Sequence, residues 1–273
     1  PRGPARTETT EVSFTAKDVM ALRQKTGMGM MDCKKALSEN GGDAAAAEEW
    51  LRERMKGKMA ERTERATGEG RIGIAVEGDR AAIVEVQTET DFTAKNDNFV
   101  AMVADVAKLA LSQPAGDVAS DDAIAKRIDD VRLTTRENMS LSRGMRLEGG
   151  TFGHYIHHDG RRGVLLQVEG DVDEETARGI CQHIVFHDPK GISEADVDPA
   201  VIDEVRAEAI EEAKQTGKPE EIAQKIAEGR VRKYLEENTL LNQKYVLDES
   251  KQIKDILPSG ATVKTFVRYT LGA

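Results

Sequence analysis

The feature that most constrains the fold of this sequence is a β-hairpin pattern followed by a helical pattern, which occurs twice. In the first copy, strand-like apolar runs at residues 71–77 and 80–87 are joined by Gly78-Asp79. A glycine there supplies the positive φ that a tight hairpin turn requires. A helical pattern follows from about residue 96 to 111, and a loop is expected at 114–120. Together these elements predict a small α+β subdomain.

The second copy of the pattern lies downstream. Its strand-like runs, 151–158 and 163–168, are joined by Asp159-Gly160, and its helical pattern covers 174–186. A helical segment at 121–143 is expected to connect the two copies. The copies share a pattern and not residue identities, and they suggest an internal duplication. We expect two similar α+β subdomains with small antiparallel sheets, at residues 71–143 and 144–198.

Three short helical patterns lie within residues 14–59, near the N-terminus. The first should end at Gly27 and the second near Gly41, because glycine tolerates the left-handed conformation that ends helices. This predicts a compact three-helix module, whose small core suits interaction better than catalysis. The flanking segments 1–13 and 60–70 are expected to be a flexible tail and a linker.

Two long helical patterns, at residues 199–216 and 219–237, are separated by Gly217-Lys218-Pro219. Gly and Pro at this break end one helix and start the next, which predicts a helical hairpin over 199–240. The apolar positions that would form its seam are Ile222, Ile226 and Val231. Plain packing within the monomer and an interaction arm are equally compatible with the pattern. The segment 241–273 is expected to return to the core, with a strand that adds to one of the sheets.

Composition and charge limit the class of protein. The net charge of −10 argues against general binding to nucleic-acid phosphates, which requires clustered Lys and Arg. No apolar run approaches the roughly 20 residues needed to cross a bilayer. The two isolated cysteines, Cys33 and Cys181, form no disulfide framework. We therefore expect a cytoplasmic protein that binds another protein, without direct nucleic-acid or membrane contacts.

Catalytic motifs are not recognisable in the sequence. His154, His157 and His158 are close together, but strand geometry keeps any two of them from readily chelating one ion. His183 and His187 share a helical face without the Glu of H-E-x-x-H. The phosphate-loop, dinucleotide and nucleophile-elbow motifs are missing as well. We expect a binding protein with no metal site, no cofactor and no covalent chemistry.

The connector after the first hairpin carries an acidic residue beside an aromatic one. It begins at Glu89 and continues as Thr90-Asp91-Phe92-Thr93, between a strand-like run and a helical run. Functional groups often lie on such connectors, where a rigid scaffold presents them. A lone Phe is more often buried, however. From the residues alone, Phe92 either packs inward under the strand or is presented to a partner.

Four segments, spread over most of the chain in the family's order, resemble the signatures of the elongation factor Ts family. They are LRQKTGMGMMDCKKAL at 22–37, TDFTAKN at 90–96, YIH at 155–157 with GVL at 163–165, and GKP at 217–219 with KI at 225–226 and EGR at 228–230. The resemblance implies a ubiquitin-associated-like N-terminal module, a core of two α+β subdomains and a helical hairpin.

The resemblance also implies an activity. Members of the family promote nucleotide exchange on elongation factor Tu, the GTPase that delivers aminoacyl-tRNA to the bacterial ribosome. This chain would bind elongation factor Tu in its GDP-bound and nucleotide-free forms, disturb the Mg²⁺ and phosphate site, and promote GDP release. It would act by binding and would catalyse no covalent reaction. A homodimer and a 2:2 complex with the partner are both open.

By analogy with the family, Phe92 is a wedge that enters between two helices of elongation factor Tu, with Asp91 as its polar neighbour. The segment that dislocates Mg²⁺ would comprise Thr90, Asp91, Phe92 and Thr93. The other residues that would contact the partner are Arg23, Met30, Met31 and His157. Two alternatives remain open: the two methionines could pack in the core, and His157 could be a strand histidine without a role in binding.

The sequence departs from the family pattern at two places. Thr93 stands where the family commonly has an apolar residue, which would make that contact weaker or wetter. Phe186-His187-Asp188-Pro189 replaces the small residues expected there. Two rival functions also remain open: an adaptor that binds stably without accelerating nucleotide release, and a zinc-dependent hydrolase that uses the histidines.

Overall fold

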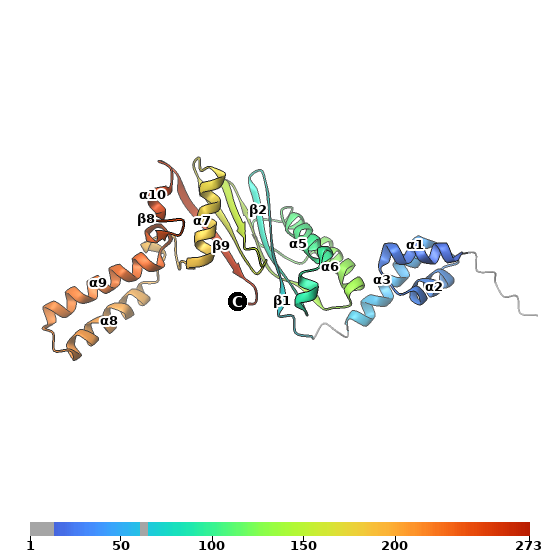
Figure 1. The fold of residues 1–273 in the computed structure, drawn as a ribbon, viewed down its shortest axis with the longest axis horizontal. Helices are drawn as coiled ribbons and strands as arrows, with labels where there is room; N and C mark the ends of the chain where they lie inside the picture. The colour runs from blue at the N-terminus through green and yellow to red at the C-terminus, as the bar shows by residue number, and fades with distance from the viewer. Residues whose placement is uncertain (1–13, 61–64) are drawn as a thin grey trace, which may run out of the picture. The chain divides into compact units, whose positions relative to one another are not determined.

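The structure is a computed structural model that describes residues 14–60 and 65–273 (Figure 1). The expected tail at 1–13 and the central part of the expected linker, 61–64, lie outside the described residues. Helices and small antiparallel sheets make up the described chain, which confirms the α+β prediction. Two compact units divide it. The first comprises residues up to Glu69 with Gln87–Met102 and Ser120–Ser140, and the second Gly70–Val86, Val103–Ala119 and Leu141–Ala273.

Three helices form the N-terminal part of the first unit, as predicted: α1 (Ala16–Thr26), α2 (Met30–Glu39) and α3 (Ala44–Ala60). Thr15 caps α1 in a capping box with Asp18, and Gly27 ends it in the left-handed conformation at φ 66°. Their core is apolar and includes Met28 and Cys33. Leu133 of α6 (Asp122–Thr135) belongs to the same core, so this core is completed by a helix far along the chain.

The first sheet has the strand order β1-β2-β4-β3, with β1 (Glu69–Glu77), β2 (Arg80–Thr88), β3 (Gly116–Asp117) and β4 (Met139–Glu148). Two predictions fail here. The expected loop contains β3, and the expected helix 121–143 ends at Thr135. Arg136 adopts the left-handed conformation, φ 62°, which ends the helix. Met139 then begins a strand in which more buried and more exposed residues alternate over most of its length.

The second sheet has the order β5-β6-β9, with β5 (Thr151–Ile156), β6 (Arg162–Glu169) and β9 (Thr262–Thr270). All pairs are antiparallel, and β9 confirms the prediction that the C-terminal strand joins a sheet. Helix α7 (Glu174–His187) packs on β5 and β6 (Figure 1). Val164, Leu166 and Ile180 are fully buried in the core between them.

The two hairpin-and-helix copies share one packing device. A Cβ on Gly73 of β1 would lie 2.8 Å from the Val103 carbonyl oxygen of α5 (Asp97–Ala110). A Cβ on Gly153 of β5 would likewise lie 2.8 Å from the Cβ of Ala177 in α7. In each copy, glycine on the first strand therefore lets the helix approach the sheet. This common close approach supports the interpretation of an internal duplication.

The helical hairpin consists of α8 (Pro199–Gln215) and α9 (Glu220–Asn238). The predicted seam is correct at Val231 and wrong at Ile222 and Ile226, which are 46% and 40% exposed. Besides Val231, the buried positions of the two helices are all alanines: Ala209, Ala213, Ala223 and Ala227. Small side chains let the two helices pack closely, which leaves the bulkier isoleucines outside. The remaining elements are η1 (Glu194–Asp196), η2 (Leu240–Asn242), β7 (Lys244–Tyr245), β8 (Asp248–Gln252) and α10 (Ile253–Ile256).

His183 of α7 joins that helix to the segment that follows the hairpin. Its Nδ1 accepts a hydrogen bond from the Val246 N–H at 3.2 Å, and its Nε2 is 2.9 Å from Gln243 Oε1. The ring is fully buried and stacks on His187, with ring centroids 4.4 Å apart. Burial lowers the pKa of His183 to about 4, and the neighbouring His187 acts in the same direction. This is a neutral, structural histidine.

Acid should therefore destabilise the fold through His183. The pKa is near 6.5 in the unfolded chain and about 4 in the folded one, so stability falls as pH drops from about 6.5 to 4. The expected loss is at most about 3 kcal/mol. Urea unfolding at a series of pH values would measure it. His183→Gln should show a smaller acid-induced loss than the parent. The exposed control His187→Gln should keep most of the loss, because burial is the largest cause of the lowered pKa of His183.

Candidate functional site

The connector that carries Asp91 and Phe92 is a one-turn helix, α4 (Asp91–Ala94). Thr90 is its N-cap, and its hydroxyl accepts a hydrogen bond from the Thr93 N–H at 3.3 Å. This turn directs Phe92 outward, where the residue is 84% exposed. The alternative in which Phe92 packs under the strand is therefore wrong, and the phenyl ring is presented on a capped turn.

Asp91 is paired locally. Its carboxylate accepts a hydrogen bond from Lys95 Nζ at 2.7 Å, one turn along the chain. That hydrogen bond is the main reason why the pKa of Asp91 is lowered. The charge of Asp91 is thus maintained at neutral pH next to the exposed ring.

Thr93 faces inward. It is 8% exposed, so the departure from the family pattern at this position lies inside the unit and not on its outer face. Its hydroxyl helps to lower the pKa of Glu137, whose carboxylate also receives hydrogen bonds from Thr88 and Thr90. Sequence reasoning did not identify Glu137, because 47 residues separate it from Thr90. No local pattern marks such a pair.

The candidate residues of the three-helix module lie on its surface. Met30 is 46% exposed and Met31 75%, so neither fills the core, and Met28 does so instead. Arg23 of α1 is exposed as well and lines a shallow depression with Met20, which is 56% exposed. Met20 lies outside the signature segment, and sequence reasoning did not select it.

His157 follows the end of β5 and is half-buried, so the strand is shorter than the predicted 151–158. Its Nδ1 lies 3.2 Å from the Tyr155 hydroxyl, and its ring makes edge contact with Phe186 at a centroid distance of 5.7 Å. Phe186 is 55% exposed. The departure noted at 186–189 therefore adds an exposed phenyl ring beside His157.

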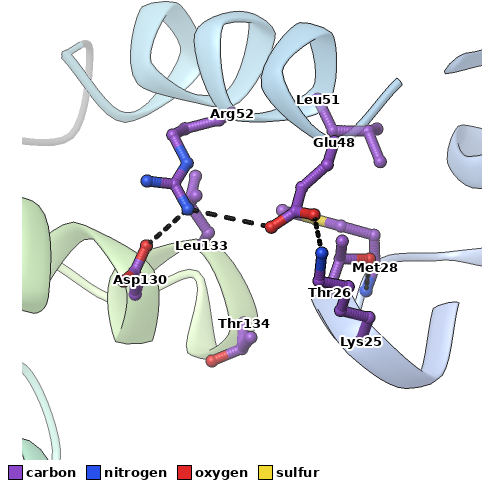
Figure 2. A pocket seen from close by; sticks show the side chains of 9 residues that line it. All are labelled: Lys25, Thr26, Met28, Glu48, Leu51, Arg52, Asp130, Leu133 and Thr134. Carbon is purple, nitrogen blue, oxygen red and sulfur yellow. Dashed lines mark hydrogen bonds and ion pairs between the residues drawn. The ribbon is translucent and has the colours of Figure 1, made fainter. Parts of the chain in front are cut away.

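A cavity of about 240 Å³ lies between α1, α3 and α6 within the first unit (Figure 2). Its charged side chains are already paired: Lys25 contacts Glu48 at 2.5 Å, and Arg52 contacts Asp130 at 2.9 Å. None of the candidate residues lines it. The cavity is a junction between helices and does not form part of the candidate site.

The described part of the chain holds neither a candidate metal cluster nor a helix suited to span a membrane. Within residues 14–60 and 65–273, no group of three or more His, Cys, Asp or Glu side chains could hold a metal ion. None of the described helices is long and apolar enough to cross a membrane.

Comparison with known sequences identifies the family. The sequence model described as "Elongation factor TS" matches residues 89–273. The chain belongs to the elongation factor Ts family. Its matches include the elongation factor Ts of Ruegeria sp. (strain TM1040), 40% identical over 96% of this chain and 93% of the relative. The elongation factor Ts of Thiobacillus denitrificans is 44% identical over 95% of this chain and 92% of the relative.

Membership in the elongation factor Ts family gives the general role of the chain. It is a translation elongation factor, and nucleotide exchange on elongation factor Tu is the general function of that family. Binding to elongation factor Tu is the interaction that the family implies. The matched region of the family model contains Asp91, Phe92 and His157, whereas Arg23, Met30 and Met31 precede it.

Proposed function

We propose that this chain binds elongation factor Tu·GDP, disturbs its Mg²⁺ and phosphate site, and promotes GDP release during translation elongation. It does so by binding alone, without covalent chemistry, and we place this action in the cytoplasm. The observation that carries the proposal is the exposure of Phe92, 84%, on a capped turn next to Asp91. Full burial of a phenyl ring contributes about 2–3 kcal/mol of favourable free energy. That free energy becomes available for binding when a partner covers the ring.

The segment Thr90, Asp91, Phe92 and Thr93 acts as the wedge in this proposal. Phe92 supplies the apolar contact area, and Asp91 supplies a charge that can exchange its Lys95 partner for a group on elongation factor Tu. Displacement of the partner's helices would loosen Mg²⁺ and then GDP. Reciprocity follows from linkage: if this chain weakens nucleotide binding, nucleotide weakens binding of this chain by the same factor. The factor therefore leaves when GTP enters.

The remaining contacts come from two other surfaces. Arg23, Met30 and Met31 would bind the partner from the three-helix module at 14–59, whose methionines adapt readily to an apolar surface. His157 would bind from the second subdomain, oriented by Tyr155. The hairpin at 199–240 and the return at 241–273 would act as a scaffold for the core.

The proposal is tested by the release of a fluorescent GDP analogue from elongation factor Tu, with and without this chain. Acceleration that saturates with factor concentration supports it. Binding of the chain without acceleration would overturn it in favour of an adaptor. Mass spectrometry of the chain, the GTPase and the nucleotide before and after exchange should show no covalent change.

A further inference from the structure

Three hydroxyl-bearing residues around the Asp91-Phe92 pair converge on one carboxylate. Glu137 Oε1 accepts from the Thr90 hydroxyl at 2.7 Å. Glu137 Oε2 accepts from the Thr88 hydroxyl at 3.0 Å and from the Thr90 N–H at 3.1 Å. Thr93 provides a further side-chain hydrogen bond. One side chain therefore fixes the connector on both sides of the exposed pair.

The position of Glu137 follows from the end of α6. Arg136 adopts the left-handed conformation, φ 62°, which stops the helix and turns the next residue toward the connector. Burial by itself would raise the pKa of Glu137, but the threonine hydrogen bonds outweigh it and lower the pKa. Glu137 is thus ionised at neutral pH and acts only as an acceptor, which matches the donors that surround it.

The Thr90 hydroxyl couples Glu137 to the cap of α4. It donates to Glu137 and accepts from the Thr93 N–H. Because the carboxylate fixes the direction of the hydroxyl hydrogen, the hydroxyl lone pair is directed at the Thr93 N–H, and the two hydrogen bonds strengthen each other. Loss of Glu137 would leave the hydroxyl free to rotate and weaken the cap.

A second carboxylate connects the same two segments in the opposite direction. Glu89, on the connector, accepts from the Asn138 N–H at 2.7 Å and from Arg65 at 3.2 Å. Glu137 in turn accepts from the Thr90 N–H. Each segment therefore contributes one carboxylate that accepts a hydrogen bond from a backbone N–H of the other segment. A helix of four residues is not stable by itself, and the exposed Phe92 ring adds little packing. The conformation of the wedge therefore depends on these contacts.

We propose that Glu137 is the positioning residue for the Asp91-Phe92 pair: it holds Thr88, Thr90 and Thr93 so that α4 presents Phe92 in one orientation before elongation factor Tu arrives. This inference rests on the proposed exchange function. A wedge that is fixed in advance loses less conformational freedom on binding. If only a fraction of the molecules present Phe92 correctly, the apparent affinity for the partner falls by that fraction.

The test compares Glu137→Gln with the parent in the GDP-release assay, using the full chain over a range of factor concentrations. The amide donor of glutamine would oppose the Thr90 and Thr88 donors. We expect the concentration for half-maximal acceleration to rise about tenfold, with the maximal rate nearly unchanged. Phe92→Ala should instead lower the maximal rate. In the Phe92→Ala background, Glu137→Gln should have no further effect, since positioning acts through that ring.

Two measurements separate positioning from a general loss of structure. Thr88→Val removes one donor to Glu137 and should raise the half-maximal concentration about threefold, while Thr88→Ser should match the parent. Hydrogen exchange on the free chain should show faster exchange of the Thr90 and Thr93 amides in Glu137→Gln, without change in α8 and α9. Unchanged exchange at these two amides, or an unchanged half-maximal concentration for both Glu137→Gln and Thr88→Val, would overturn the proposal. If the parent itself does not accelerate GDP release, the proposed function fails, and hydrogen exchange still decides whether Glu137 orders the connector.

Discussion

Phe92→Ala is expected to lower the maximal acceleration of GDP release about 10- to 100-fold. The ring is 84% exposed in the free chain and would be buried between helices of the partner. Burial of a phenyl ring at the centre of an interface contributes about 2 kcal/mol or more, and 1.4 kcal/mol corresponds to a factor of ten. Stopped-flow release of a fluorescent GDP analogue at saturating factor measures the effect.

The variant should lose activity without losing stability. Because the ring makes few contacts in the free chain, the free energy of unfolding should change by less than about 0.5 kcal/mol. Leu247→Ala is a matched control: Leu247 is 64% exposed, directly follows Val246 after β7, and belongs to none of the candidate surfaces. Leu247→Ala should accelerate GDP release as much as the parent does. If Phe92→Ala also matched the parent, the wedge would have to be another group.

The elements that the sequence predicted well are those with local signals. Gly27 ends α1 in the left-handed conformation, and Gly217 with Pro219 separates α8 from α9, as expected. The sequence does not reveal strand β4, because the helical pattern of α6 continues into it. The positive φ at the end of α6 belongs to Arg136 and not to a glycine, so no local signal marks the end of the helix. Hydrophobicity alone favours large side chains for the hairpin seam, whereas the close packing of α8 and α9 uses Ala223 and Ala227.

The candidate site was predictable only in part for the same reason. The family resemblance selected Asp91 and Phe92, but the direction of the ring depends on the Thr90 cap, which is visible only in three dimensions. Glu137 binds the connector from 47 residues away. Hydrogen bonds between segments far apart in the sequence produce no recognisable sequence pattern. Residues that orient a site from a distance, such as Glu137, are therefore harder to predict than the residues that the site presents to a partner.

A second large effect is expected for Glu85, a buried carboxylate between the buried residues Val84 and Val86 of strand β2. Its side chain is 1% exposed and accepts from the Arg143 guanidinium of β4 at 2.8 Å and from the Gly272 N–H at 3.2 Å. Arg143 also donates to the Thr270 carbonyl at 2.8 Å and lies over the Tyr269 ring, 4.4 Å from its centroid. This ion pair connects β2 and β4 to the end of β9 within the second unit.

Glu85→Ala should therefore destabilise the chain by about 3 kcal/mol, because it leaves the partly buried Arg143 guanidinium without its anion. Thermal unfolding should show a Tm lower by roughly 6–12 °C. Glu77→Ala is the matched control: Glu77 ends β1 in the same sheet, but its ion pair with Arg80 is exposed and should contribute less than about 1 kcal/mol. The double replacement Glu85→Leu with Arg143→Met should recover much of the loss, since it removes both charges together. Equal Tm values for Glu85→Ala and Glu77→Ala would show that the ion pair does not hold these strands together.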